Sequence, residues 1–247
     1  MFFSFDKRIL YIFLGICVLS MVMGYLSNPA ELLSLLLSIP GVLIAITFHE
    51  YAHAYSAYKL GDDTAKLQGR LSLNPLKHMD PIGIIMLLFL GFGWGRPVQI
   101  DSRNFNRNIS LSKAEAIVSI AGPLANFILA ILFSIITIIV IKFELLAACS
   151  VRAALTILTI LKSIIAINIG LGLFNLIPLP PLDGSKVLMH FLPYKARMWF
   201  MNNEQIFYII FLVIWITGIA GIIISPAIQT VYTELLKLTA TIFGVSI

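Results

Sequence analysis

Long apolar runs restrict what this chain can fold into more than any other feature of its sequence. A helix needs roughly 20 apolar residues to cross the hydrocarbon core of a bilayer. Five runs come close to that length, at residues 9–26, 33–58, 114–141, 160–179 and 206–224, and a weaker sixth at 226–243 contains two charges. With 59% hydrophobic and 12% charged residues, the chain also lies outside the usual range of soluble globular proteins. We predict an all-α polytopic membrane protein with about six transmembrane helices.

The first run, residues 9–26, follows two basic residues, as the apolar part of a signal peptide would. It lacks a small-residue cleavage site and is long enough to span, so we expect a retained first helix. We find no internal repeat, low-complexity tract or shift in composition, which predicts that residues 1–247 form a single domain. Cys17 and Cys149 provide neither a disulfide framework nor a thiolate metal site.

The basic residues are distributed asymmetrically about the predicted spans. If the amino terminus is cytoplasmic, all of the 17 lysines and arginines except Lys142, Arg152 and Lys162 fall in or beside cytoplasmic segments. The positive-inside rule favours this orientation, with both the N- and C-termini cytoplasmic. The same scatter over loops accounts for the net charge of +5 and argues against binding of nucleic acid. The lipid bilayer is therefore the first partner that the sequence predicts.

The loop between the second and third spans, residues 60–108, has a pattern of its own. Residues 67–75 alternate and end in a turn signal, and residues 95–100 are also strand-like. Between them, residues 82–93 are apolar but short for a span. We expect a small β-sheet with a re-entrant or interfacial element in this loop.

A pattern typical of zinc proteases, His49-Glu50-Tyr51-Ala52-His53, lies toward the cytoplasmic end of the second predicted span. On a helix, residues four apart face the same side, so both imidazoles can share one metal ion. Glu50 can then reach the nucleophilic water as general base. The alternative is a pair of histidines that neighbours satisfy inside a helix bundle, but the spacing with a glutamate between them favours the metal site.

A catalytic zinc usually takes three protein ligands, so the sequence must supply one more. Asp183 is the leading candidate, because a carboxylate at membrane depth is costly unless a cation compensates it. The predicted topology places it at a depth similar to that of the histidines. His78 and Asp80 are rivals, and an aspartate before Gly184 is also common in ordinary turns.

Three prolines, at positions 178, 180 and 181, come shortly before Asp183 and prevent a helix there. Extended backbone at membrane depth is tolerated where it is buried in protein or lines a wet cavity. A hydrolytic site needs such a cavity, because water is a reactant.

Asn126 follows Gly122 and Pro123 inside the third span. Taken alone, this segment is more typical of close helix packing, with a proline kink and an asparagine bonding across helices, than of a catalytic role. Lys162 and Asn168 are more typical of snorkelling or inter-helix contacts.

The histidine motif, residues 122–126 and residues 175–184 together resemble the motifs of the site-2 protease family of intramembrane metalloproteases, peptidase family M50. Residues 73–83 and 93–98 look like those of compact prokaryotic members, which have no PDZ or CBS domains. The resemblance implies one Zn²⁺ per chain on His49, His53 and Asp183, with Glu50 as the catalytic residue. It further implies that Asn126 and Asn175 lie near the active site and position substrate.

This resemblance implies a protease of a prokaryotic cell membrane that hydrolyses transmembrane proteins or peptides near the cytoplasmic face, as in regulated intramembrane proteolysis. Two alternatives stay open at this point. A divalent-metal transporter or non-proteolytic zinc-binding scaffold would use the same histidines and aspartate without Glu50 as a base. A membrane peptidase that clears signal-peptide remnants would share the chemistry and differ in substrate. The sequence indicates no oligomeric state.

Overall fold

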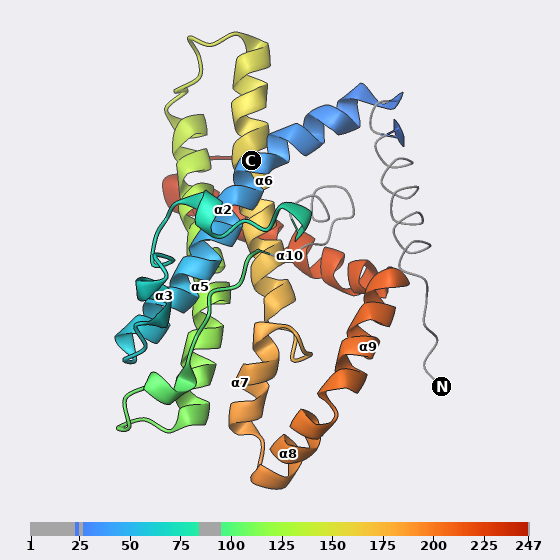
Figure 1. Ribbon diagram of the computed structural model, residues 1–247. Coiled ribbons are helices and arrows are strands. Elements are labelled where there is room, and N and C mark those ends of the chain that lie inside the picture. The colour runs from blue at the N-terminus through green and yellow to red at the C-terminus, as the bar shows by residue number, and fades with distance from the viewer. Residues whose placement is uncertain (1–22, 25–26, 84–94, 247) are drawn as a thin grey trace.

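The computed structural model describes residues 23, 24, 27–83 and 95–246 (Figure 1). The helices in this part of the chain are α2 (Pro29–Lys59), α3 (Thr64–Leu67), α5 (Leu111–Lys142), α6 (Val151–Asn175), α7 (Asp183–Phe191), α8 (Tyr194–Asn202), α9 (Glu204–Ile216) and α10 (Ile219–Phe243). Two short 3₁₀ turns, η1 (Pro75–Lys77) and η2 (Ser102–Asn104), lie in the loop between α2 and α5. The prediction of a helical membrane protein is confirmed, since α2, α5, α6 and α10 are long and apolar enough to cross a bilayer.

The predicted count of six spans is not confirmed. Residues 33–58 and 114–141 correspond to α2 and α5, and residues 160–179 correspond to α6, which begins at Val151 and ends at Asn175. Ser150 starts α6 early by accepting a hydrogen bond from the backbone N–H of Ala153, and the prolines after position 177 end it early. The predicted first span and most of the predicted re-entrant segment lie outside the described residues.

Helices α5 and α6 lie side by side, and α2 crosses them obliquely (Figure 1). Gly41 permits the crossing of α2 and α6, because a Cβ there would lie 3.2 Å from the Cα of Ile164. Farther along the bundle, Ile165 and Ile169 of α6 are buried among apolar side chains of α5 and α10. The first contact brings α2 against α6, and the second packs α6 against α5 and α10.

The predicted fifth and sixth spans are divided differently from the expectation. The chain breaks between α9 and α10 at Gly218, whose φ of 74° favours glycine, whereas Pro226 lies inside α10. At the other end of α10, the carbonyl of Phe243 accepts a hydrogen bond of 2.8 Å from Lys142 Nζ at the end of α5. Helix α9 therefore leads directly into α10, and α10 ends beside the end of α5.

The small β-sheet predicted in the loop between α2 and α5 is not found among the described residues. Residues 64–67 are helical, residues 75–77 form a 3₁₀ turn, and residues 95–100 are irregular. Within the described loop, one backbone hydrogen bond, from Arg96 N to His78 O at 2.8 Å, joins residues 95–100 to a residue just beyond the 67–75 segment. A ladder cannot continue because Pro97 has no N–H and the side chain of Arg70 occupies the carbonyls of Arg96 and Pro97.

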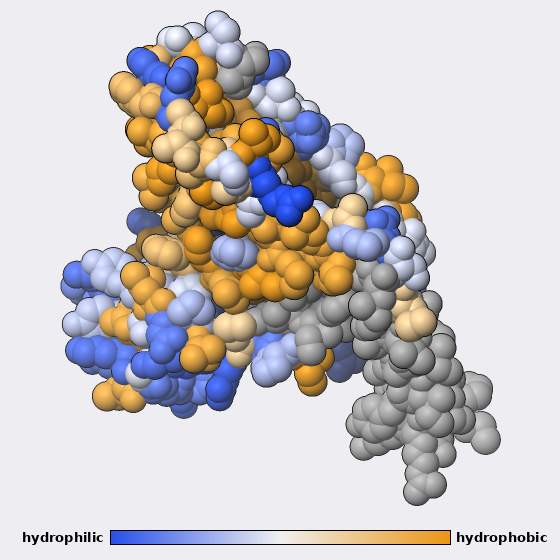
Figure 2. All heavy atoms as spheres, turned by 90° about the horizontal axis from the view of Figure 1, so that it is seen from above, coloured by the Kyte–Doolittle hydropathy of each residue, from blue (hydrophilic) through white to orange (hydrophobic). Residues whose placement is uncertain are grey.

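Apolar side chains cover much of the outer surface, and hydrophilic ones gather in separate areas (Figure 2). Exposed apolar residues include Ile128 and Leu132 on α5 and Ile222 and Ile223 on α10. Such a surface suits contact with lipid rather than water. The chain is therefore a membrane protein, as its composition predicts.

Candidate active site

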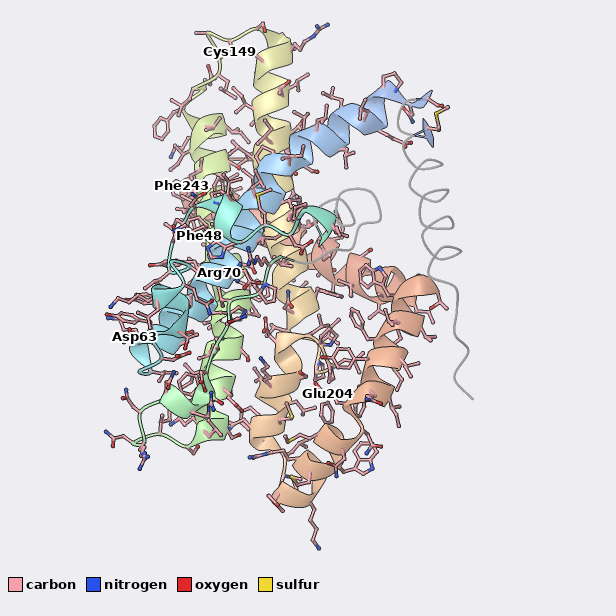
Figure 3. The ribbon with its side chains drawn as sticks, in the orientation of Figure 1. Phe48, Asp63, Arg70, Cys149, Glu204 and Phe243 are labelled. Carbon is pink, nitrogen blue, oxygen red and sulfur yellow. The ribbon has the colours of Figure 1, made fainter. Side chains whose placement is uncertain are left out.

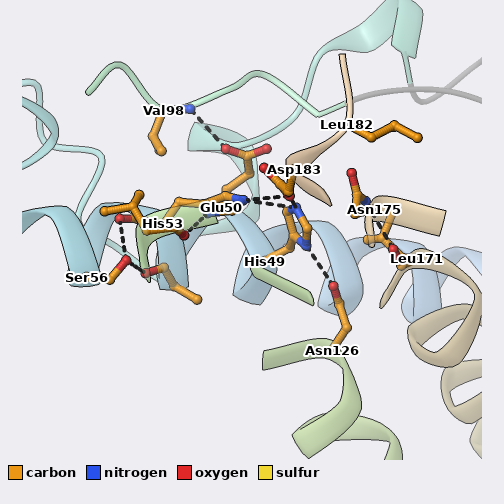
Figure 4. Close-up of polar contacts among 12 residues, drawn as sticks. His49, Glu50, His53, Ser56, Val98, Asn126, Leu171, Asn175, Leu182 and Asp183 are labelled. Atoms are coloured by element: carbon orange, nitrogen blue, oxygen red, sulfur yellow. Dashed lines mark hydrogen bonds and ion pairs between the residues drawn. The ribbon is translucent and has the colours of Figure 1, made fainter. Parts of the chain in front are cut away.

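His49 and His53 lie one turn apart on the buried face of α2, where residues four apart share a side. Their Nε2 atoms are 3.1 Å apart. Asp183 begins α7, and its Oδ2 lies 3.1 Å from His49 Nε2 and 3.2 Å from His53 Nε2 (Figure 4). The structure thus brings together the three side chains that the sequence suggests as metal ligands.

The other nitrogen of each imidazole has a fixed partner. His53 Nδ1 lies 2.7 Å from the carbonyl oxygen of Val118, and because a carbonyl can only accept, this nitrogen must carry the proton. His49 Nδ1 lies 2.7 Å from Asn126 Oδ1. Both Nε2 atoms therefore present lone pairs toward Asp183.

Two hydrogen bonds donated by its amide group orient the side chain of Asn126. Its Nδ2 donates to the carbonyl of Ala45 at 3.1 Å and to Asn168 Oδ1 at 3.0 Å. These two acceptors leave Oδ1 facing His49, where it accepts the imidazole proton. Asn126 and Asn168 are both completely buried, so the inter-helix contact expected of Asn168 is part of the support for His49.

The three ligand atoms fit a divalent metal ion such as zinc. Neighbouring ligands of a tetrahedral zinc with bonds of about 2.0–2.1 Å lie roughly 3.3 Å apart, close to the separations of 3.1 to 3.2 Å among His49, His53 and Asp183. Asp183 Oδ2 is buried and accepts no hydrogen bond, so it faces two nitrogen lone pairs without a proton between them. A cation removes that repulsion.

Glycine is needed where other segments approach these ligands. A Cβ on Gly122 of α5 would lie 2.5 Å from His53 Nε2 and 2.7 Å from His49 Cε1. A Cβ on Gly184 would collide with the carbonyl of Leu176. Asp183 is therefore the first residue of a helix packed tightly against the preceding turn, rather than part of an ordinary Asp-Gly turn.

The carboxylate of Glu50 lies beside the ligand cluster. Glu50 is largely buried, and its Oε2 accepts a hydrogen bond of 2.9 Å from the backbone N–H of Val98 (Figure 4). Glu50, His49, His53 and Asp183 all line one cavity of about 530 Å³. An acid–base group, three ligand atoms and space for a reactant thus occur together.

The two asparagines expected near the site lie in different surroundings. Asn175, at the end of α6, lines the cavity and donates from Nδ2 to the carbonyl of Leu171 at 3.1 Å. Asn126 does not line the cavity but lies behind His49. The geometry therefore fits contact with substrate for Asn175 and orientation of a ligand for Asn126.

His78 and Asp80, the rival ligands, lie outside the cluster. His78 is buried and donates from Nε2 to the carbonyl of Ser72 at 2.6 Å, and Asp80 accepts from the N–H groups of residues 82 and 83. Sequence reasoning did not single out the contact of Val98 with Glu50, because a backbone N–H leaves no mark on residue type.

A second, apolar cavity of about 410 Å³ adjoins the first. It lies among α2, α6 and α10, and it shares Ile46, Leu171 and Phe174 with the cavity at the ligand cluster. Phe174 also packs edge-on against Trp215 of α9, with ring centroids 5.2 Å apart. These side chains form the boundary between the polar site and the apolar space.

Membrane-crossing helices that carry a buried His-Glu-His group, with a carboxylate available as third ligand, define a class, the membrane-embedded metallohydrolases. The family model described as "Peptidase family M50" matches residues 138–218, which contain Asn175 and Asp183. The "Putative zinc metalloprotease YwhC" of Bacillus subtilis (strain 168) is 42% identical over 205 residues, or 82% of this chain and 90% of that protein. The chain therefore belongs to peptidase family M50, and the predicted enzyme class, a zinc metalloprotease, is confirmed.

More distant relatives have names of the same kind. The "Putative zinc metalloprotease Rip2" of Mycolicibacterium smegmatis is 35% identical over 100 residues, or 39% of this chain and 38% of that protein. The protein of the same name from Mycobacterium tuberculosis (strain ATCC 25618 / H37Rv) is 29% identical over 154 residues, or 61% of this chain and 55% of that protein. No solved structure matches the chain significantly.

Proposed function

We propose that this protein is an intramembrane zinc protease that hydrolyses peptide bonds of transmembrane substrates near the cytoplasmic face. One observation carries the proposal. The three ligand atoms of His49, His53 and Asp183 converge within hydrogen-bond distance in a cavity that also contains the Glu50 carboxylate, and α2, which carries the two histidines and Glu50, is long enough to cross a bilayer.

In this proposal His49 and His53, through Nε2, and Asp183, through Oδ2, hold one Zn²⁺ per chain. Bound zinc supplies Lewis acidity that activates water and polarises the scissile carbonyl. Glu50 accepts the proton of the attacking water and later delivers it to the leaving amine. Because the Val98 N–H occupies Oε2, Oε1 is the oxygen that handles this proton.

Asn126 and Asn175 have separate roles in this mechanism. Asn126 keeps the proton of His49 on Nδ1, so that Nε2 remains a ligand. Asn175 uses its carboxamide at the cavity wall to position the substrate backbone.

The substrate must be extended at the scissile bond, because a helical peptide group is shielded by its own hydrogen bonds. Residues 95–100 run past Glu50 and help to line the cavity, and we propose that the substrate adds to this segment as a strand. The N–H of Val98 already binds Glu50, so pairing with substrate must use neighbouring backbone groups.

The proposed orientation follows from the charges and from one contact. With the first residues of α5 in the cytoplasm, its end at Lys142 lies on the opposite side of the membrane. Since Lys142 binds the carbonyl of Phe243, the end of α10 also lies on that side. We therefore replace the earlier expectation of a cytoplasmic C-terminus with an external one, and keep the amino end of α5 and its preceding loop in the cytoplasm.

The alternative of a metal transporter or zinc scaffold assigns no chemical task to Glu50. The proteolytic proposal is favoured because the carboxylate of Glu50 lines the same cavity as the three ligands and because the chain belongs to a peptidase family. The other alternative, a peptidase that clears signal-peptide remnants, is included in this proposal, because such remnants are one kind of transmembrane substrate.

The test is cleavage of a generic single-span substrate by the purified protein in detergent, with bound zinc measured by elemental analysis. We expect Glu50→Gln to keep zinc and lose turnover, and Asp183→Ala to lose both. Asp63→Ala and Glu234→Gln change exposed carboxylates and serve as matched controls that keep both. Zinc-loaded wild type that cleaves none of several substrates, or a Glu50→Gln variant that cleaves normally, would contradict the proposal.

A further inference from the structure

Arg70 is a buried cation held by backbone carbonyls. Only 8% of the residue is exposed. Figure 3 labels Arg70, which lies in the interior of the molecule. Its guanidinium donates from Nη1 to Pro97 O at 2.6 Å and from Nη2 to Lys77 O at 2.7 Å and Arg96 O at 3.2 Å. Burying an arginine is costly unless its donors are used, and here they connect two segments that no sheet joins.

One of these carbonyls belongs to the peptide group that touches Glu50. Pro97 C=O and Val98 N–H are part of the same planar unit and point to opposite sides of it. Arg70 holds the oxygen of this unit at 2.6 Å, and Glu50 Oε2 receives its N–H at 2.9 Å. Arg70 therefore fixes the orientation of this peptide plane from one side, and the hydrogen bond to Glu50 on the other side depends on that orientation.

Other contacts hold the segment in place without fixing that plane. Gly95 packs against α2, where a Cβ would lie 2.7 Å from Ile46 Cγ2. The side chain of Val98 is buried with Ala54 and Ala65. Loss of Arg70 should thus leave the segment attached while the 97–98 peptide plane becomes free to tilt.

We propose that Arg70 is a positioning residue for Glu50, acting through the Pro97–Val98 peptide group. The inference rests on the proposed role of Glu50 as general base. Lysine cannot replace Arg70, because one ammonium group cannot reproduce a planar fork that reaches three carbonyls at once.

The experiment compares Arg70→Ala and Arg70→Lys with Arg107→Ala, which removes the same charge from an exposed position in the loop before α5. We expect both Arg70 variants to keep zinc and to lose turnover, by about a hundredfold for alanine, the loss that a misplacement of about 1 Å can cause. Arg107→Ala should match wild type in both respects.

Chemical rescue distinguishes positioning from general support of the fold. Arg70 lines an open cavity of about 610 Å³, so guanidinium in the millimolar range can enter the space left by alanine. We expect it to restore part of the turnover of Arg70→Ala and to leave Arg107→Ala and Arg70→Lys unchanged. Guanidinium is itself a denaturant, so it would not restore activity to an Arg70→Ala variant that had only lost stability.

Hydrogen exchange supplies a readout that does not need substrate. The Val98 amide should exchange faster in Arg70→Lys and also in Glu50→Ala, because each removes one of the two partners of the same peptide plane, while amides of α5 keep their protection. This result is independent of the proteolytic proposal, which fails separately if zinc-loaded wild type cleaves nothing.

Three results would overturn the inference. The first is wild-type turnover in Arg70→Lys, and the second is unchanged exchange at Val98 in that variant. The third is that Arg70→Ala loses turnover and also loses zinc or the hydrogen-exchange protection of α5, since Arg70 would then support the whole fold rather than Glu50.

Discussion

Gly122 lies where α5 passes the two histidines, and its missing side chain is what lets the helices meet. Gly122→Ala should lower zinc content and turnover together, because the added Cβ would lie 2.5 Å from His53 Nε2 and force the imidazoles apart. Alanine is better than glycine in a helix by about 1 kcal/mol, so the fold should be retained. Elemental analysis and circular dichroism check this. Gly221→Ala, in α10 with no atom within 4 Å of the added Cβ, is the control; full zinc content in both variants would contradict the argument.

Asn126 and Asn175 should respond differently to the same substitution. Asn126→Leu removes the acceptor of the His49 Nδ1 proton, and loss of such a partner typically lowers metal affinity by about 10- to 100-fold. Asn175→Leu should leave zinc affinity unchanged and lower turnover, because this side chain lines the cavity without contacting a ligand. Competition with a chelator measures the affinity. Equal zinc affinity in the two variants would remove the distinction between their roles.

At the residue scale, the sequence predicted which candidate ligands lie together, but not the groups that support them. A helical spacing of four predicted that His49 and His53 share a side, and the cost of a carboxylate at membrane depth pointed to Asp183. The contacts of Arg70 and Val98 could not be anticipated, because they depend on carbonyl and N–H groups that every residue carries. Asn126 was expected to bond across helices, but its particular partner, His49, is decided by how α2 packs on α5.

At the scale of elements, the loop between α2 and α5 is held by the buried carboxylate of Asp62. It accepts hydrogen bonds from Asn104 Nδ2 at 2.9 Å, from Asp101 N at 2.8 Å and from the N–H and hydroxyl of Thr64. Burial raises the pKa of Asp62, but these hydrogen bonds outweigh it and bring that pKa below its ordinary value.

The lowered pKa of Asp62 predicts a dependence of stability on pH. A depressed carboxyl pKa contributes stability that is fully present above the unfolded pKa of about 3.9 and is lost as the pH falls through the lower folded pKa. Wild type should therefore lose thermal stability in detergent below about pH 4 more steeply than Asp62→Asn. Asp63→Asn, at an exposed neighbour, should keep the wild-type slope. Parallel curves for wild type and Asp62→Asn would refute the assignment.

Strand addition to residues 95–100 makes a prediction about one backbone group. Gln99 is exposed and follows Val98, so Gln99→Pro should lower turnover by removing an N–H available to substrate, while zinc content stays unchanged. Val98→Pro is unsuitable, because it would also remove the donor to Glu50. Gln99→Ala keeps the N–H and is the control. Undiminished turnover in Gln99→Pro would rule out pairing through that N–H.

The helices were predicted most accurately where hydrophobicity alone determines their extent. Helices α2 and α5 follow their apolar runs closely, since length and hydropathy suffice for a span. In the loop between α2 and α5, apolar and polar residues alternate as in a strand, which led to the prediction of a β-sheet. Pro97 and the guanidinium of Arg70 prevent a ladder of backbone hydrogen bonds there. The predicted boundary between the fifth and sixth spans was wrong. It was placed before Pro226, because proline usually interrupts a helix, but the break lies at Gly218, which has a positive φ.

At the scale of the whole molecule, the contact between Lys142 and Phe243 predicts an external C-terminal end. In a chain whose two cysteines are replaced by serine, Ser246→Cys should react with a membrane-impermeant maleimide in intact cells. Arg107→Cys, in the loop before α5, should react only after the cells are permeabilised. Labelling of position 246 only after permeabilisation would restore the prediction that both termini are cytoplasmic.

The adjoining cavities suggest a route to selective inhibition. A small molecule with a metal-chelating head, such as a hydroxamate, would place that head in the space of about 530 Å³ beside Asp183. A branched hydrocarbon tail would pass Phe174 into the apolar space of about 410 Å³. The head would bind wherever a protease offers a metal ion, so selectivity would come from the tail, which alone reaches the apolar space among α2, α6 and α10.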